Sequence, residues 1–198
     1  MTTPLYDSRL FITLATAAVA IAACGGGSPL DNPETLANPP GTNGQKLSYA
    51  YFERCVNPVL KTPLRVNING AISTNTCAAG GCHDNTTGTG GALRLLQAAA
   101  PAASGATPAE VRATDMFKNY YSSLGESVVG APDDSRLLNK PLVRGVLHGG
   151  GLIFESAGSA EAKLLRFWIS RPMPQGQDEF SAAADTMFDP LTGACKTD

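Results

Sequence analysis

The sequence predicts a mostly α-helical domain with long loops, and three observations lead to this expectation. Apolar residues recur at helical spacing in several separate segments after residue 45. The chain shows no series of strands and hairpins and no internal repeat. Glycine-rich stretches, such as residues 88–91 and 149–151, separate the helical segments. Long connections inside a compact domain usually have a function or accompany a group that fills the core.

The N-terminus predicts a lipoprotein signal peptide over residues 1–23. Arg9 is followed by an uncharged run of fourteen residues, Leu10 to Ala23, which suits a signal peptide and is short for a membrane span. The next residue completes "IAAC", which resembles a bacterial lipobox, where cleavage precedes the cysteine and its thiol carries lipid. An ordinary secretory signal with a chance cysteine is the alternative. We expect lipidation at Cys24 and a place in the bacterial cell envelope, facing the periplasm or associated with the outer membrane.

Residues 24–44 predict a flexible tether, because their glycines and prolines oppose both a core and a regular hydrogen-bond ladder. Residues 45–198 then form one candidate domain, large enough for a single core. The formal net charge of -2 argues against a nucleic-acid partner, which requires a basic surface. No second apolar span follows Cys24. The expected protein is a soluble domain held at a membrane by its N-terminal lipid.

The first predicted helix begins near Leu47, and Pro58 is expected to bend its last turn. Residues 62–76 contain Pro63 and Gly70, which predicts a loop or a short extended piece. A short helix is expected at residues 135–138. A final helix is expected from about residue 159 to 170, before Pro172. Its inward-facing residues are expected to be Leu164, Leu165, Trp168 and Ile169.

The helix predicted at residues 107–125 has the clearest boundaries. Thr107 can cap its N-terminus, Pro108 suits the first helical position, and Glu110 completes a capping box. Gly125 is expected to end it. The expected apolar face contains Ala113, Met116, Phe117, Tyr120, Tyr121 and Leu124.

The segment "NTCAAGGCHDNTTGTGGALRL", residues 75–95, places Cys77, Cys82 and His83 in the order of a covalent haem site. Four residues separate the cysteines, where the usual pattern has two. In a helix the second cysteine would lie about 140° around from the first, so "AAGG" must leave helical geometry, which Gly80 and Gly81 permit. A small Cys77–Cys82 disulfide ring beside a loop histidine is an alternative. A zinc site is disfavoured because the chain has only two histidines.

Several segments resemble a planctomycete-type family of small envelope cytochrome c domains, in a variant with "HGGG" in the ligand loop. They are "CAAGGCHD", "GGALRL", "GAPDDSRLLNKPL" and the final-helix segment "LLRFWIS", which together span residues 77–170. The resemblance implies a cytochrome c-like fold. It also implies one covalent haem c, attached through Cys77 and Cys82 with His83 as the proximal iron ligand.

The resemblance further implies that His148, in "LHGGG", is the distal iron ligand, because the family supplies this ligand from the loop before the last helix. Residues 149–151 would let the backbone lie close to the haem face. A loop histidine without a ligand role is the alternative. Met173, in "RPMPQ", is the rival ligand, since a methionine between prolines can bind haem iron, but it follows the last helix.

Basic residues near these motifs are candidate partners for the haem propionates, because buried carboxylates need cations. They are Arg94, Arg136, Lys140 and Arg144. The basic excess between residues 136 and 171 favours docking of an acidic redox partner protein, although an ordinary solvated surface has the same pattern.

Two cysteines remain once lipid and haem take the other three, and an exported domain rarely leaves two thiols free. In cytochrome c folds the first and last helices pack together, so the resemblance also supports a disulfide between Cys55 and Cys195. The expected protein is a membrane-tethered monohaem c-type cytochrome that carries single electrons to partners the sequence does not identify. It is not expected to be an enzyme, since both axial positions are filled. The alternative is a haem-free, disulfide-braced lipoprotein that serves as an interaction or scaffold module; a gas-binding sensor would require a displaceable His148.

Overall fold

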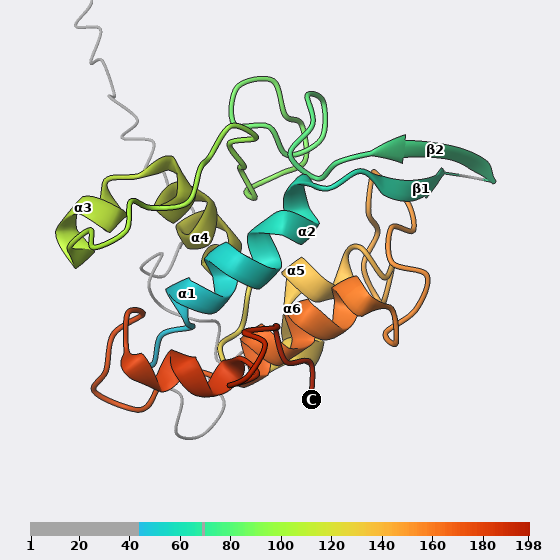
Figure 1. Ribbon diagram of the computed structural model, residues 1–198. Coiled ribbons are helices and arrows are strands. Elements are labelled where there is room, and N and C mark those ends of the chain that lie inside the picture. Colours follow the sequence, from blue (N-terminus) through green and yellow to red (C-terminus); the bar gives the residue numbers. More distant parts are fainter. Residues whose placement is uncertain (1–43, 69) are drawn as a thin grey trace, which may run out of the picture. The chain divides into compact units, whose positions relative to one another are not determined.

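The structure is a computed structural model that describes residues 44–68 and 70–198 (Figure 1). The predicted signal peptide, Cys24 and all of the tether except Gly44 lie outside the described residues. Among the helices of the described ranges, none has the length and apolar character needed to cross a membrane.

The first predicted helix is confirmed, but it consists of three consecutive segments. These are α1 (Tyr49–Tyr51), the π-helical turn η1 (Phe52–Val56) and α2 (Asn57–Lys61). Ser48 caps the start, its Oγ accepting from the Tyr51 N–H at 3.0 Å. In the π turn the Asn57 N–H bonds to the Phe52 carbonyl, five residues back. The irregular turn thus precedes Pro58, whose ring would otherwise collide with a carbonyl of a regular helix.

A β-hairpin occupies the segment that was expected to be a loop or a short extended piece. Strands β1 (Leu64–Ile68) and β2 (Ala71–Asn75) are antiparallel, with Ile68 opposite Ala71 at the turn end. Gly70 has a φ of +86°, in the left-handed region that an Asn-Gly turn requires. Figure 1 shows the hairpin projecting from the helices, beside the chain between α5 and α6.

The helix predicted over residues 107–125 is two helices, α3 (Pro108–Arg112) and α4 (Asp115–Gly125). The predicted capping box is confirmed, since the Glu110 carboxylate accepts from the Thr107 N–H at 2.7 Å and the Thr107 Oγ1 accepts from the Glu110 N–H. A second cap, Thr114, accepts from the Phe117 N–H at 3.1 Å and separates the two helices. Tyr121, expected to face the core, is 69% exposed, and Ala113 is also exposed.

The remaining predicted helices are confirmed as α5 (Arg136–Asn139) and α6 (Ala160–Ser170). Ser159 caps α6, and its buried face includes Leu165, Trp168 and Ile169, while Leu164 is only partly buried. Two 3₁₀ turns were not predicted, η2 (Pro132–Asp134) and η3 (Ala182–Met187).

Three aromatic side chains from different helices meet at the centre of the core. The Phe52 ring lies 5.4 Å from Trp168 and 5.6 Å from Tyr120, measured between ring centres. The polar atoms of Trp168 and Tyr120 form hydrogen bonds to the backbone just before the first helix. Trp168 Nε1 donates to the Ser48 carbonyl at 2.9 Å, and the Tyr120 hydroxyl donates to the Leu47 carbonyl at 2.8 Å. Buried Tyr and Trp normally find such partners.

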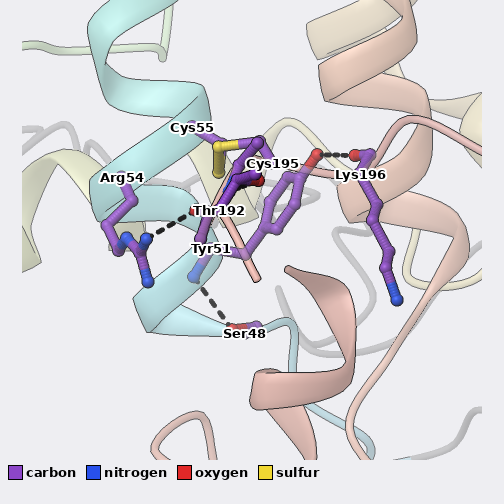
Figure 2. The surroundings of a disulfide bond; sticks show 9 residues. Ser48, Tyr51, Arg54, Cys55, Thr192, Cys195 and Lys196 are labelled. Atoms are coloured by element: carbon purple, nitrogen blue, oxygen red, sulfur yellow. Dashed lines mark hydrogen bonds between the residues drawn. A yellow bond between two sulfur atoms is a disulfide. The ribbon is translucent and has the colours of Figure 1, made fainter. Parts of the chain in front are cut away.

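The predicted disulfide between Cys55 and Cys195 is present, with a Cα–Cα distance of 6.0 Å across 140 residues of sequence (Figure 2). It fixes the C-terminal segment to the first helix. Neighbouring contacts do the same: the Arg54 Nη2 donates to the Gly193 carbonyl at 2.7 Å, and the Tyr51 hydroxyl donates to the Lys196 carbonyl. The C-terminal segment therefore covers one side of the first helix.

Candidate functional site

The segment Cys77–His83 forms a compact turn that packs against the end of α2. The Ala78 N–H donates to the Leu60 carbonyl at 3.2 Å, and the His83 N–H closes the turn on the Cys77 carbonyl at 3.0 Å. Gly81 has a φ of +79°, which a residue with a side chain rarely adopts. The departure of "AAGG" from helical geometry is therefore confirmed, and it brings both cysteines and His83 into one turn.

His83 is held by the segment 90–95, part of the "GGALRL" pattern. Its Nδ1 lies 3.2 Å from the Leu93 carbonyl, and its own carbonyl accepts from the Leu95 N–H at 2.7 Å. A carbonyl can only accept, so Nδ1 carries the proton and Nε2 keeps its lone pair. Burial, together with the nearby His148 and Lys140, lowers the pKa of His83 despite the Leu93 bond, so the ring is neutral. A neutral imidazole with one free nitrogen has the form that can bind a metal ion.

Gly90 lies against the His83 ring, and a side chain at this position would force its neighbours to move. A Cβ at this position would be 2.6 Å from the ring atoms Cε1 and Nδ1 of His83, and 2.7 Å from the Cys82 carbonyl oxygen. The Gly90 N–H also donates to that carbonyl at 2.8 Å. Sequence analysis missed this role, because a glycine in a glycine-rich loop gives no sign of which side chain it contacts.

His148 lies in a loop that runs from Pro141 to Phe154. Its Nδ1 is 2.9 Å from the Gly151 carbonyl, and the Gly151 N–H donates back to the His148 carbonyl at 2.8 Å. Gly151 has a φ of +73°, which this tight turn requires. His148 therefore has the same arrangement as His83, with Nδ1 bound to a backbone carbonyl and Nε2 left as the free nitrogen.

The two histidine rings are separated by the distance that one iron between them requires. Their centres are 6.2 Å apart and their planes differ by 14°. With both Nε2 atoms directed at one metal, two metal–imidazole bonds of about 2.0 Å each, plus about 1.1 Å from each bonded nitrogen to its ring centre, would give a separation of about 6.2 Å. The distance between the ring centres of His83 and His148 is therefore compatible with a shared haem iron.

A cavity of about 500 Å³ contains both histidines and both motif cysteines in its wall. This is the size of a cofactor pocket. The apolar part of the rest of the wall comes from α2, β1, α5, α6, segment 90–95 and the loop of His148. It consists of Leu60, Leu64, Val66, Leu93, Leu137, Pro141, Leu147, Ile153, Phe154 and Leu165.

Cys77 and Cys82 are free thiols in the described part of the chain, and both are partly buried. Burial, and then the proximity of Cys82, raises the pKa of Cys77 to about 11, so this thiol is protonated at neutral pH. The Cys82 Sγ accepts a weak hydrogen bond from Asn75 Nδ2 at 3.6 Å. Both cysteines line the cavity and belong to the same turn as His83.

Two of the four candidate cations line the cavity: Arg136, the first residue of α5, and Lys140, which caps the C-terminus of that helix four residues later. Neither forms an ion pair within the described residues. Arg144 instead pairs with Asp133 at 3.1 Å, and Arg94 is absent from the cavity wall. Glu126 also lines the cavity, and sequence analysis had not singled it out.

Met173, the rival ligand, lies away from this cavity. Its side chain is 2% exposed within the core, its N–H donates to the Lys46 carbonyl at 2.7 Å, and its carbonyl accepts from Gln45 Nε2 at 2.7 Å. It is not part of the cavity wall, and neither is Met116 or Met187, both buried in the same core.

The described residues hold no group of three or more His, Cys, Asp or Glu side chains placed to bind a metal ion. A histidine pair suits an iron whose other four ligands come from a porphyrin. In comparisons with known proteins, no protein family, curated protein or solved structure matches the chain.

Proposed function

We propose that this protein is a monohaem c-type cytochrome with a cytochrome c-like fold, tethered to a membrane by lipid on Cys24, that carries single electrons in the bacterial cell envelope. The observation that carries the proposal is the geometry of the histidine pair. The ring centres of His83 and His148 are 6.2 Å apart on the wall of one cavity. Cys77 and Cys82 line the same cavity, as covalent attachment requires.

Each side chain has a defined part in this proposal. Cys77 and Cys82 would add their S–H groups across the two vinyl groups of the porphyrin, with sulfur bonding to one carbon and hydrogen to the other, so nothing leaves. His83 and His148 would supply Nε2 to the iron, and their Nδ1 bonds to backbone carbonyls fix the tautomer and orient the rings. Bound haem would supply a one-electron couple.

The rest of the wall sets the environment of that couple. Its apolar side chains exclude water, which favours the iron state of lower charge. Arg136 and Lys140 are the cations placed to neutralise propionates. Because His83 and His148 would both bind the iron and leave no position for a substrate, the proposed role is electron transfer and not catalysis at the iron.

The test is expression of the chain with a haem-maturation system, followed by mass measurement and peroxidase staining of a denaturing gel. The proposal predicts the added mass of one haem and a stained band, because only thioether-bound haem survives denaturation. Cys82→Ala should lose or weaken the stain. The double variant Cys55→Ala/Cys195→Ala is the matched control and should keep it, because those cysteines lie outside the cavity wall. An unmodified wild-type mass, with no stain, would favour the haem-free scaffold instead.

A further inference from the structure

The loop that presents His148 is closed at its base. The Pro141 carbonyl accepts from the N–H groups of Ile153 at 2.9 Å and Phe154 at 3.1 Å, which joins the two ends of the loop. Between these ends lie four glycines, at positions 145 and 149–151. Glycine has more backbone freedom than any other residue, so the hydrogen bonds at Pro141 alone would leave the position of His148 weakly determined.

The loop is also bound to the β1–β2 hairpin, through Leu152. The Asn67 N–H donates to the Leu152 carbonyl, and the Leu152 N–H donates to the Asn67 carbonyl, both at 3.2 Å. The two residues therefore pair as in an antiparallel sheet, four residues after His148. Arg65 adds an exposed ion pair to Glu155 at 3.5 Å, which contributes little.

The pairing uses a part of β1 that the hairpin itself leaves free. In an antiparallel strand the N–H and C=O of one residue point to the same edge, so those of Asn67 point away from β2. Every residue of β2 is exposed, while Val66 on β1 is 7% exposed and lines the cavity. Ser73 and Asn75 of β2 also line the cavity, and Leu64 at the start of β1 is partly buried against the main core. The hairpin therefore lies against both the cavity and the loop of His148.

We propose that the β1–β2 hairpin positions His148, by holding the glycine-rich loop in place through the paired backbone hydrogen bonds between Asn67 and Leu152. Asn67 is a positioning residue, and its backbone, not its side chain, carries the effect. This inference rests on the proposed function, because it concerns how firmly the distal ligand is held.

The test is Asn67→Pro in the haem-loaded protein. Proline removes the N–H that bonds to Leu152 and leaves the β1–β2 ladder intact, since that N–H does not take part in it. It also removes the Asn67 Oδ1, which accepts from the Gly70 N–H at 3.0 Å in the hairpin turn, so Asn67→Ala, which loses only this side-chain bond, is a second control and should leave both readouts unchanged. Thr74→Pro is the matched control, because Thr74 pairs with Arg65 at a position where its N–H also points away from the partner strand. The readouts are the ferric spin state and the affinity of the ferrous protein for carbon monoxide, which competes with His148.

Asn67→Pro should raise carbon monoxide affinity roughly three- to tenfold over wild type, the equivalent of one lost hydrogen bond, and add a high-spin fraction, while Thr74→Pro should change neither. Equal affinities in the two variants would overturn the inference and leave the proposed function standing. A wild-type chain without haem would overturn the proposed function itself. Should Asn67→Pro fail to fold, Leu152→Pro breaks the reciprocal bond from the loop. In wild-type protein, the Asn67 and Leu152 amides should exchange with deuterium more slowly than the Arg65 and Thr74 amides, and equal rates would also contradict the inference.

Discussion

Replacement of Gly90 by alanine should displace the His83 ring and destabilise the protein before any cofactor is added. The new Cβ would lie 2.6 Å from two ring atoms and 2.7 Å from the Cys82 carbonyl oxygen. Ordinary contacts begin near 3.4 Å, so the ring and backbone must separate by roughly 0.8 Å. The ring cannot turn away freely, because the Leu93 carbonyl holds its Nδ1. Overpacking of this kind costs about 1–3 kcal/mol.

The assay is urea unfolding of the apoprotein. With a loss of about 2 kcal/mol and a urea dependence of about 2 kcal/mol per molar, the midpoint should fall by about 1 M. Gly125→Ala at the end of α4 is the control, because its added Cβ meets no atom within 4 Å outside its own helix turn, and its midpoint should equal or exceed that of wild type, since alanine favours the helix over glycine. A urea midpoint of Gly90→Ala equal to that of wild type would show that the absence of a side chain at position 90 is not needed to hold the His83 ring in place.

Three further predictions concern stability and processing. The double variant Cys55→Ala/Cys195→Ala should unfold at lower denaturant, with a loss of at most about 4–5 kcal/mol for a loop of this length; an unchanged midpoint would contradict a stabilising role. The hydrogen bonds and charge of Arg166, followed by the hydrogen bond and charge of Arg144, lower the pKa of Asp133 from 3.8 to about 2. This stabilisation is therefore present above the unfolded-state pKa of 3.8 and is lost as the pH falls through about 2. Because Asp133 is exposed, Asp133→Asn should lower the free energy of unfolding by only about 0.5–1 kcal/mol at pH 7. It should also reduce the loss of stability between pH 4 and pH 2, measured by thermal unfolding at several pH values. A loss of stability at acid pH equal to that of wild type would contradict this. Cys24→Ser should abolish incorporation of labelled palmitate, and undiminished labelling would exclude the lipidation site.

Local signals in the sequence predicted most of the helices, because their ends depend on nearby residues. The capping box of Thr107 and Glu110 is such a signal. The same logic should have divided the helix at Thr114, another good N-cap, and the Asn-Gly pair at residues 69–70 should have predicted the hairpin. Both features therefore have local signals in the sequence.

Other features depend on contacts between distant segments and left no local pattern. Tyr121 fits the apolar face of α4 by spacing, yet it is exposed while Asn119 is buried. Asn119 bonds to the Leu96 backbone, with its Oδ1 accepting from the N–H at 2.7 Å and its Nδ2 donating to the carbonyl at 3.1 Å. These bonds attach to α4 the backbone at Leu96, which directly follows the segment 90–95 that contacts His83. A buried asparagine of this kind can be recognised only once its partner strand or loop is known.

The candidate site contains residues of both kinds, those with a local sequence signal and those without one. Cys77, Cys82, His83 and His148 were selected from motifs, and the structure brings all four to one cavity. The contact of Gly90 with the His83 ring and the pairing of Asn67 with Leu152 were not predicted. Each depends on how the chain folds in three dimensions, and no local sequence pattern reveals it.

The central claim is that His83 and His148 are the two axial ligands of one haem iron. Absorption and electron paramagnetic resonance spectra of the ferric protein test it most directly, compared among wild type, His148→Ala and Met173→Leu. The account predicts low-spin iron in wild type and an unchanged spectrum for Met173→Leu, because that side chain lies outside the cavity wall. His148→Ala should give high-spin iron that binds carbon monoxide on reduction. Low-spin iron that persists in His148→Ala would contradict the account, and its loss in Met173→Leu would assign the distal position to Met173.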